Sequence, residues 1–285
     1  MNYRHAYHAG NFADVVKHAV LCRVLTYLRE KPAAFRVIDT HAGAGMHDLT
    51  GTEASRTAEW RDGIGRLLAA PLDAEIRALL APYLDAVAAC NPADRLTTYP
   101  GSPALVRSFL RRQDRLIACE LEPHAARALA RNLHGDVRVK TIEIDGWTAL
   151  SAYVPPKERR GVVLVDPPFE QPDDFTRLAQ GLETAHRKWP TGIYLLWYPI
   201  KEPAEVTGFA RRLVRSGIAK ILRVELVVAP GADTTKLQGC GLVIVNPPWT
   251  LENELARLLP ALAAVLSRDG KGGVKLDWLA GEARK

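Results

Sequence analysis

The segment 162–169 carries the clearest chemical signal in the chain. Four apolar residues lead to the carboxylate of Asp166, and Pro167, Pro168 and the aromatic ring of Phe169 follow it. The exocyclic amine of a nucleobase is a poor nucleophile because its lone pair is delocalised into the ring. Hydrogen bonds from that amine to Asp166 and to the Pro167 carbonyl favour a reactive geometry, and Phe169 can stack on the base. The pattern therefore predicts a catalytic site made of Asp166, Pro167 and Phe169 rather than a proline-rich surface turn.

A second copy of this pattern stands near the end of the chain, at residues 243–249. Apolar residues there precede Asn246, two prolines and Trp249. The strand before this copy follows a short polar loop, so we expect it to form a hairpin and to run antiparallel. Its carboxyl end then lies at the edge of the sheet opposite the ligand. We therefore interpret Asn246 as structural and Asp166 as the catalytic carboxylate.

A glycine turn and two acids follow three other apolar runs. Gly43 and Gly45 come after residues 36–40, and such glycines let the backbone turn tightly beside a ligand. Glu120 ends the next run, where a carboxylate accepts hydrogen bonds from ribose hydroxyls, and Asp145 ends the third, where it can accept one from an adenine amine. Each feature alone also fits an ordinary turn or a surface charge. Together they predict an adenosine-containing ligand, and the missing third glycine of a G-x-G-x-x-G turn disfavours a nicotinamide cofactor.

Four further side chains have both a ligand-binding and a structural interpretation. Lys17 and His18 share one face of a predicted helix, which either meets a carboxylate-bearing ligand or is solvated. Ser102 fits the N-cap of a helix over 103–112, a role that is compatible with ligand binding. His41 stands inside the glycine turn, and this position favours a ligand contact over a structural role.

The elements that must position these residues alternate between strands and helices. Apolar spacing typical of helices covers residues 14–28, 125–133 and 175–189. Seven runs rich in Val, Ile and Leu are apolar at consecutive positions, as in strands buried on both faces of a parallel sheet, at 36–40, 116–120, 137–145, 161–166, 192–198, 221–228 and 241–246. The order predicts an α/β fold with a Rossmann-like, doubly wound sheet of seven strands, the last one antiparallel.

The connection between the first and second predicted strands is longer than a crossover requires. It has roughly 75 residues, whereas a complete crossover can be made in about 12. Helical spacing over 54–70 and 72–90 predicts a helical pair in this connection. We therefore expect one domain over residues 1–285 that contains a helical insertion subdomain over residues 47–100.

The composition is that of a globular protein rather than a disordered, collagen-like or coiled-coil chain, with 47% apolar and 25% charged residues among 285. A net charge of +6 suits an anionic partner without identifying one. The four cysteines are widely spaced and show no metal-ligand pattern. The start of the chain lacks the features of a signal peptide, and no apolar run is long enough to span a bilayer. We expect a cytoplasmic protein with neither a metal nor a membrane partner.

These motifs resemble those of class I S-adenosylmethionine-dependent methyltransferases. More closely, the chain resembles the RlmJ family of bacterial large-subunit ribosomal RNA (adenine-N6) methyltransferases. The landmarks that carry the resemblance extend through most of the chain and are Tyr3-Arg4-His5, His8-Ala9-Gly10-Asn11, Lys17-His18, Asp39 to Gly45, Tyr99-Pro100-Gly101-Ser102-Pro103, Asp166 to Phe169, Leu196-Trp197-Tyr198-Pro199 and Asn246-Pro247-Pro248-Trp249.

The resemblance implies methyl transfer from S-adenosylmethionine to the N6 of an adenine in 23S ribosomal RNA, by a monomeric enzyme. It implies RNA contacts for Tyr3 and His5 and catalysis by Asp166. The implied cofactor-binding residues are Lys17, His18, His41, Gly43, Gly45, Ser102, Glu120, Asp145, Gly146 and Asp166.

Three other functions stay open. Guanine-N2 methylation of ribosomal RNA is one, because Phe169 stands where tyrosine is common in adenine enzymes. Adenine-N6 methylation of DNA is another, since the same motif serves both polymers, although no sequence-specific DNA-reading module is recognisable. The third is an RNA-binding module without turnover, and the intact segment 166–169 argues against it.

Overall fold

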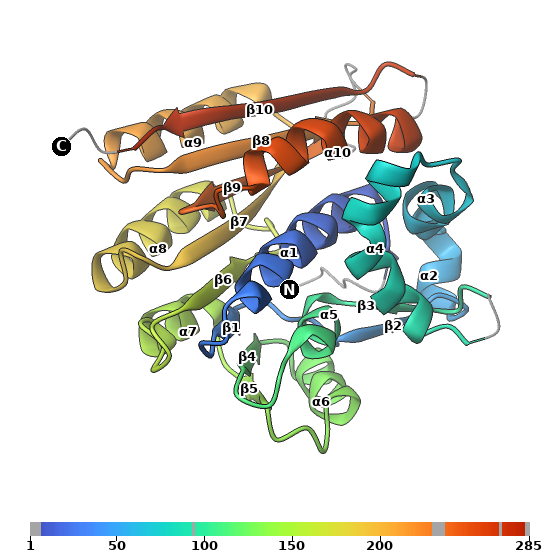
Figure 1. The fold of residues 1–285 in the computed structure, drawn as a ribbon, viewed down its shortest axis with the longest axis horizontal. Helices are drawn as coiled ribbons and strands as arrows, with labels where there is room; N and C mark the ends of the chain where they lie inside the picture. Colours follow the sequence, from blue (N-terminus) through green and yellow to red (C-terminus); the bar gives the residue numbers. More distant parts are fainter. Residues whose placement is uncertain (1–6, 93–94, 230–236, 268–269, 283–285) are drawn as a thin grey trace.

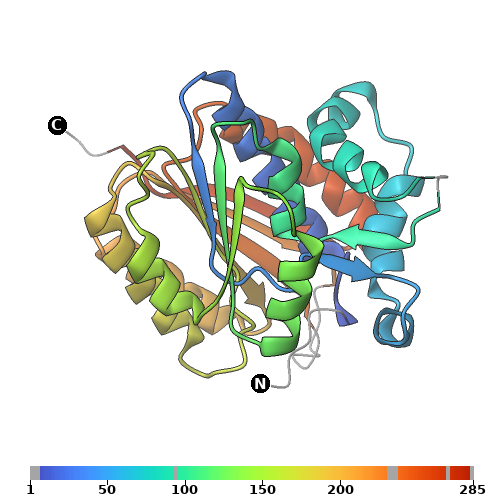
Figure 2. The ribbon, with the colours of Figure 1, turned by 90° about the horizontal axis from the view of Figure 1, so that it is seen from below.

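A central sheet with helices on both faces forms the body of the molecule (Figures 1 and 2). The computed structural model describes the whole chain except residues 1–6, 93–94, 230–236, 268–269 and 283–285. In the described part the sheet has eight strands in the order β10-β8-β9-β7-β6-β1-β4-β5. Their bounds are β1 Arg36–Asp39, β4 Arg115–Glu120, β5 Val139–Glu143, β6 Gly161–Val165, β7 Ile193–Ile200, β8 Ile221–Val227, β9 Gly239–Val245 and β10 Gly273–Ala280.

The sheet agrees with the predicted class and has one strand more than the seven predicted. Strands β4, β1, β6 and β7 pair in parallel, as does β5 with β4. Strand β9 runs antiparallel to both β7 and β8, which confirms the direction predicted for the last of the seven. The additional strand, β10, pairs antiparallel with β8 at the edge. Its residues are exposed or half-buried, so it lacks the continuous apolar run on which the prediction of strands depended.

Each face of the sheet has its own apolar core. Val162 and Leu164 of β6 join the core on one face, and the alternate residues Val163 and Val165 join the core on the other. Burial on both faces explains why this strand is apolar at consecutive positions.

The helices divide between these two faces (Figure 2). The first face is covered by α1 Phe12–Glu30, α5 Ser102–Phe109, α6 Pro123–Asn132 and α10 Leu251–Leu266. The second is covered by α7 Gly146–Tyr153, α8 Asp174–Lys188 and α9 Pro203–Arg215. Helices α1, α6 and α8 confirm the helices predicted over 14–28, 125–133 and 175–189, with ends shifted by one or two residues. Arg23 of α1 forms a two-bond ion pair with Glu254 of α10, at 2.8 and 3.0 Å.

The long connection between β1 and β4 lies against α1 and α10 (Figure 1). The second predicted helix of this connection is present as α4, but the first is broken into three short pieces. Gly63 kinks the chain here, because it passes so close to the residues just before α1 that a Cβ would lie 2.1 Å from the Gly10 carbonyl oxygen. The elements of the connection are β2 Met46–Asp48, α2 Thr52–Thr57, η2 Arg61–Gly65, α3 Arg66–Ala69, α4 Ala74–Ala89 and β3 Thr98–Pro100.

No helix in the described part of the chain is both long enough and apolar enough to cross a membrane.

Candidate active site

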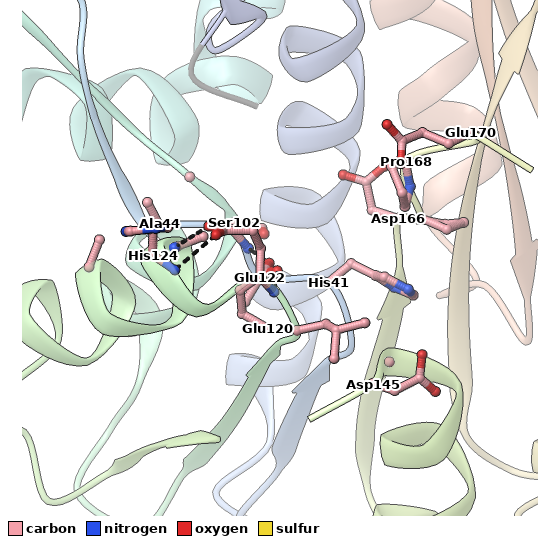
Figure 3. A pocket seen from close by; sticks show the side chains of 18 of the residues that line it. His41, Ala44, Ser102, Glu120, Glu122, His124, Asp145, Asp166, Pro168 and Glu170 are labelled. Atoms are coloured by element: carbon pink, nitrogen blue, oxygen red, sulfur yellow. Dashed lines mark hydrogen bonds between the residues drawn. The ribbon is translucent and has the colours of Figure 1, made fainter. Parts of the chain in front are cut away.

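A cavity of about 630 Å³ opens where the parallel strands β1, β4, β5 and β6 end (Figure 3). Side chains from these four strand ends and from α1 line it. Every residue that the sequence nominated for the cofactor is part of its wall except Gly45. The wall therefore includes Lys17, His18, His41, Gly43, Ser102, Glu120, Asp145, Gly146 and Asp166.

The glycine turn orients the carboxylate of Glu120. The backbone N–H of Gly43 donates to Glu120 Oε2 at 2.8 Å, and the N–H of Glu122 donates to Oε1 at 2.8 Å. Each oxygen keeps a lone pair for a further hydrogen bond. Gly43 and Gly45 both have positive φ, which explains why glycine stands at these positions. Gly45 shapes the turn away from the cavity wall, where its carbonyl accepts the N–H of Gly101 at 2.9 Å.

Ser102 and Asp39 form a buried pair beside the cavity. The hydroxyl of Ser102 donates to Asp39 Oδ2 at 2.6 Å. The prediction of Ser102 as an N-cap is wrong, because Gly101 occupies the cap position and Ser102 is already the first residue of α5. That helix also ends at Phe109 rather than at 112. Burial raises the pKa of Asp39 to about 7, and the hydrogen bond from Ser102 lowers it only in part.

His41 and Asp145 also line this cavity (Figure 3). Burial lowers the pKa of His41 to about 4, so its ring is uncharged at neutral pH. Asp145 is the N-cap of α7 and accepts the N–H of Thr148 on Oδ1 at 2.9 Å. Gly146 follows it, and a Cβ at this position would lie 2.5 Å from His41 Nε2. Gly146 therefore leaves the space that the His41 ring occupies.

The ammonium group of Lys17 lies between two carboxylates. It is 2.8 Å from Asp14 Oδ1 and 2.5 Å from Asp166 Oδ2, and the Lys17 side chain is 4% exposed. Burial by itself lowers the pKa of Lys17, but the charges of Asp14 and Asp166 outweigh burial and hold the pKa above its usual value. Lys17 is thus a buried cation whose position is tied to that of Asp166.

A second cavity, of about 500 Å³, lies on the other side of this ion pair. Phe169 lines it, and the Phe169 ring packs edge-on against Trp197 with 5.8 Å between centroids. His8 also lines it, and its hydrogen bond with Glu59 raises the pKa of His8 against the lowering effect of burial. The two cavities share Lys17, Asp166, Pro167 and Pro168 as lining residues.

Sequence reasoning missed several side chains of these two walls. Trp197 belongs to the segment 196–199, which carries part of the family resemblance, but nothing near it in the sequence indicates that its ring contacts Phe169. Arg177 lines the first cavity and lies over the Trp147 ring at 5.0 Å, and its only local signal is a place on the polar side of a predicted helix. Tyr3 and His5, which were expected to meet RNA, lie outside the described residues.

The second copy of the catalytic pattern lies at the opposite edge of the sheet. Asn246 follows the antiparallel strand β9, and its side-chain amide donates to the carbonyls of Pro190 and Gly192, both at 2.8 Å. These carbonyls precede β7, so Asn246 is at the edge where parallel strands begin. Asp166 follows β6 at the edge where they end. Only Asp166 meets the two cavities.

In the described ranges, no group of three or more His, Cys, Asp or Glu side chains is placed to hold a metal ion.

The strand order, the glycine turn and the acids at successive strand ends define a class I methyltransferase fold. Residues 32–280 match the family described as "Ribosomal RNA large subunit methyltransferase D, RlmJ". The chain belongs to this family.

Similar proteins are known from three bacteria. A protein named ribosomal RNA large subunit methyltransferase J from Escherichia coli is 38% identical over 99% of this chain and 100% of its own length. The protein of the same name from Haemophilus influenzae is 37% identical over 99% of this chain and 100% of its own length. A crystal structure of a Legionella pneumophila protein has a TM-score of 0.86 and 33% identity, and covers 95% of this chain and 98% of the other.

Proposed function

We propose that this protein transfers a methyl group from S-adenosylmethionine to the exocyclic N6 of an adenine in 23S ribosomal RNA. One observation carries the proposal. Two cavities of about 630 and 500 Å³ share Asp166, Pro167 and Pro168, so two ligands can approach the same carboxylate from opposite sides. Membership in a family of large-subunit ribosomal RNA methyltransferases supports this choice of RNA.

The larger cavity fits S-adenosylmethionine in size and in its set of donors and acceptors. Its volume lies within the range of about 300–1,000 Å³ that small-molecule sites occupy. Glu120 is held by two backbone N–H groups and suits ribose hydroxyls, and Asp145 suits an adenine amine. When bound, S-adenosylmethionine supplies a methyl group on a positively charged sulfur. The carboxylate of Asp166 at the far end of the cavity favours a cation there.

The smaller cavity gives the base its position. Lys17 holds Asp166 through Oδ2, so Oδ1 can accept a hydrogen bond from the N6 amine. The Pro167 carbonyl accepts the second amine proton, and Phe169 stacks on the ring. With both amine protons held, the nitrogen lone pair would be directed at the methyl carbon. The new N–C bond would form as the S–C bond breaks, S-adenosylhomocysteine would leave, and the nitrogen would give up one of its two protons. Catalysis is then mainly a matter of positioning.

The base must reach this cavity outside a duplex, because N6 is engaged in base pairing there. We therefore propose a single-stranded or flipped-out adenine as the substrate. The proposal also assigns the protein to the cytoplasm, where ribosomal RNA is assembled, and takes it to act as a monomer. Light scattering on the purified protein tests the monomer.

The experiment is methylation of unmodified 23S RNA with labelled S-adenosylmethionine, followed by mapping and nucleoside analysis of the product. We expect label in N6-methyladenosine at one position. Asp166→Ala, with its fold checked by circular dichroism, is the inactive control. Label in N2-methylguanosine, or in DNA in place of RNA, would replace the proposed substrate. RNA binding without any transfer would refute the proposed activity.

A further inference from the structure

The residues just before α1 form part of the wall of the smaller cavity. His8 and Asn11 both line it, and the wall continues into α1 with Phe12 and Ala13. Phe12 and Ala13 are also buried in the apolar core, which fixes their positions. The His8 side chain, by contrast, is 38% exposed and does not belong to that core. The position of the His8 ring must therefore come from polar contacts.

Glu59 of the insertion makes such contacts with this wall. Its two carboxylate oxygens lie 3.1 and 3.0 Å from Nδ1 of His8. Nδ2 of Asn11 donates to Glu59 Oε2 at 3.0 Å. Glu59 lines the same cavity and stands between α2 and η2. One carboxylate from the insertion therefore holds two side chains of the cavity wall.

The partners of Asn11 and the chemistry of a carboxylate fix the direction of these hydrogen bonds. Asn11 is the N-cap of α1, and its Oδ1 accepts the N–H groups of Ala13 and Asp14, both at 3.0 Å. Its Nδ2 is thereby turned toward Glu59. An ionised carboxylate only accepts hydrogen bonds, so His8 donates from Nδ1. Glu59 thus meets two donors, as a carboxylate requires.

The main chain of the same segment is held by other residues of the insertion. The N–H of Ile64 donates to the Gly10 carbonyl at 2.9 Å. The hydroxyl of Thr57 donates to the Tyr7 carbonyl. A change at Glu59 leaves both bonds in place. It therefore releases the two side chains without removing these supports of the backbone.

The contact with Glu59 also changes the charge of His8. The hydrogen bond and the negative charge of Glu59 raise the pKa of His8, and the charge of Asp14 raises it further. Burial and the positive charge of Lys201 lower it. Loss of the Glu59 carboxylate should therefore lower the pKa of His8, which gives a signature of this contact that is separate from activity.

We propose that Glu59 is a positioning residue, which holds the His8 ring in the wall of the smaller cavity so that the RNA base meets a site already formed. A wall that is ordered beforehand avoids the cost of immobilising a side chain when the base binds. The inference rests on the proposed function in its choice of ligand. It gives the insertion a role at the site, because Glu59 belongs to the insertion and lines the cavity.

The test measures methyl transfer to unmodified 23S RNA together with histidine NMR on the full chain. Glu59→Ala removes both side-chain bonds, so we expect the KM for RNA to rise about two- to tenfold. The kcat at saturating RNA and the Kd for S-adenosylmethionine should be nearly unchanged. The His8 signal, assigned by its absence in His8→Ala, should titrate at a lower pH than in the wild type.

A double-mutant cycle separates an effect through His8 from a general loss of packing. If Glu59 acts chiefly through His8, Glu59→Ala should raise the KM for RNA by less than about twofold in a chain that already carries His8→Ala. Glu59→Gln keeps the shape of the side chain and one acceptor oxygen. Its KM should lie between those of the wild type and Glu59→Ala.

Glu75→Ala is the matched control. Glu75 is another carboxylate of the insertion, on α4, and it pairs with Arg257 of α10. It is not one of the residues that line the two cavities. We expect the KM for RNA and the His8 titration of this variant to match the wild type.

Two results would overturn the inference. One is a Glu59→Ala variant with the KM of the wild type, and the other is an equal rise in KM whether residue 8 is histidine or alanine. If Glu59→Ala does not fold, Glu59→Gln replaces it in the cycle, and a His8 titration identical to the wild type then refutes the contact. A wild-type protein that methylates no RNA would instead refute the proposed function, and the His8 titration would still show whether Glu59 holds the ring.

Discussion

Asp39→Asn probes the most unusual carboxylate next to the site. Asp39 is 0% exposed, and burial raises its pKa to about 7, against the opposing effect of the hydrogen bond from Ser102. The same carboxyl in an unfolded chain has a pKa of about 3.9. The difference of about 3 pKa units, at about 1.4 kcal/mol each, corresponds to about 4 kcal/mol of stability.

The sign follows from proton binding in the two states. Between about pH 4 and pH 7 the folded protein keeps a proton on Asp39 that the unfolded chain has released. The free energy of unfolding therefore falls as the pH rises through this window. Below the pKa of Asp39 in the unfolded chain, ionisation of Asp39 does not change the free energy of unfolding. Above the pKa of Asp39 in the folded protein, the decrease in the free energy of unfolding is complete. Asparagine has nearly the same shape and does not ionise. The free energy of unfolding of Asp39→Asn, minus that of the wild type, should rise by about 4 kcal/mol across the window.

The assay is urea unfolding of both proteins at a series of pH values, followed by tryptophan fluorescence. Groups common to both proteins cancel in the difference. Asp48→Asn is the control, since Asp48 is exposed and hydrogen bonds from Thr50 lower its pKa, so it titrates below the window. Its difference from the wild type should be flat from about pH 5 to pH 8. An equally flat difference for Asp39→Asn would refute the assignment of a raised pKa to this carboxyl.

Three further predictions concern the two cavities. Asp166→Ala should reduce single-turnover methyl transfer by about a hundredfold or more, whereas Asn246→Ala should stay active. The opposite pattern would exchange their roles. Glu120→Gln should raise the Kd for S-adenosylmethionine about tenfold or more by calorimetry, because a charged acceptor is lost, and an unchanged Kd would exclude it as a cofactor ligand. Phe169→Ala should lower kcat/KM for RNA about five- to a hundredfold without changing the Kd for the cofactor, while Phe169→Tyr keeps the ring and the rate. Equal losses in the alanine and tyrosine variants would show that stacking is not what Phe169 provides.

The sequence was most informative where geometry follows from strand direction alone. The carboxyl ends of parallel strands lie at one edge of a sheet. The sequence alone therefore predicts that Glu120, Asp145 and Asp166 lie together at that edge, and all three line the larger cavity. The same rule separated Asp166 from Asn246, because a strand that returns from a hairpin points the other way.

Contacts between distant segments had no comparable signal. Lys17 and Asp166 are 149 residues apart, and nothing around Lys17 indicates which carboxylate it meets. The sequence showed that Ser102 lies at the start of a helix, but the helix begins one residue earlier than predicted. The Ser102 hydroxyl therefore bonds to Asp39 instead of capping the backbone. The edge strand β10 alternates polar and apolar residues over a half-exposed surface, and that pattern is weak over eight residues.

The ion pair between Arg23 and Glu254 has a consequence for how the enzyme is made. It joins residues 231 positions apart, so this contact of α1 can form only when α10 has been made. During synthesis α1 leaves the ribosome early, whereas α10 is translated near the end of the chain. Contacts of such long sequence separation form slowly and leave apolar surface exposed meanwhile. A nascent chain stopped before α10 would therefore carry the residues of the candidate site and still lack one of the helices that pack against α1.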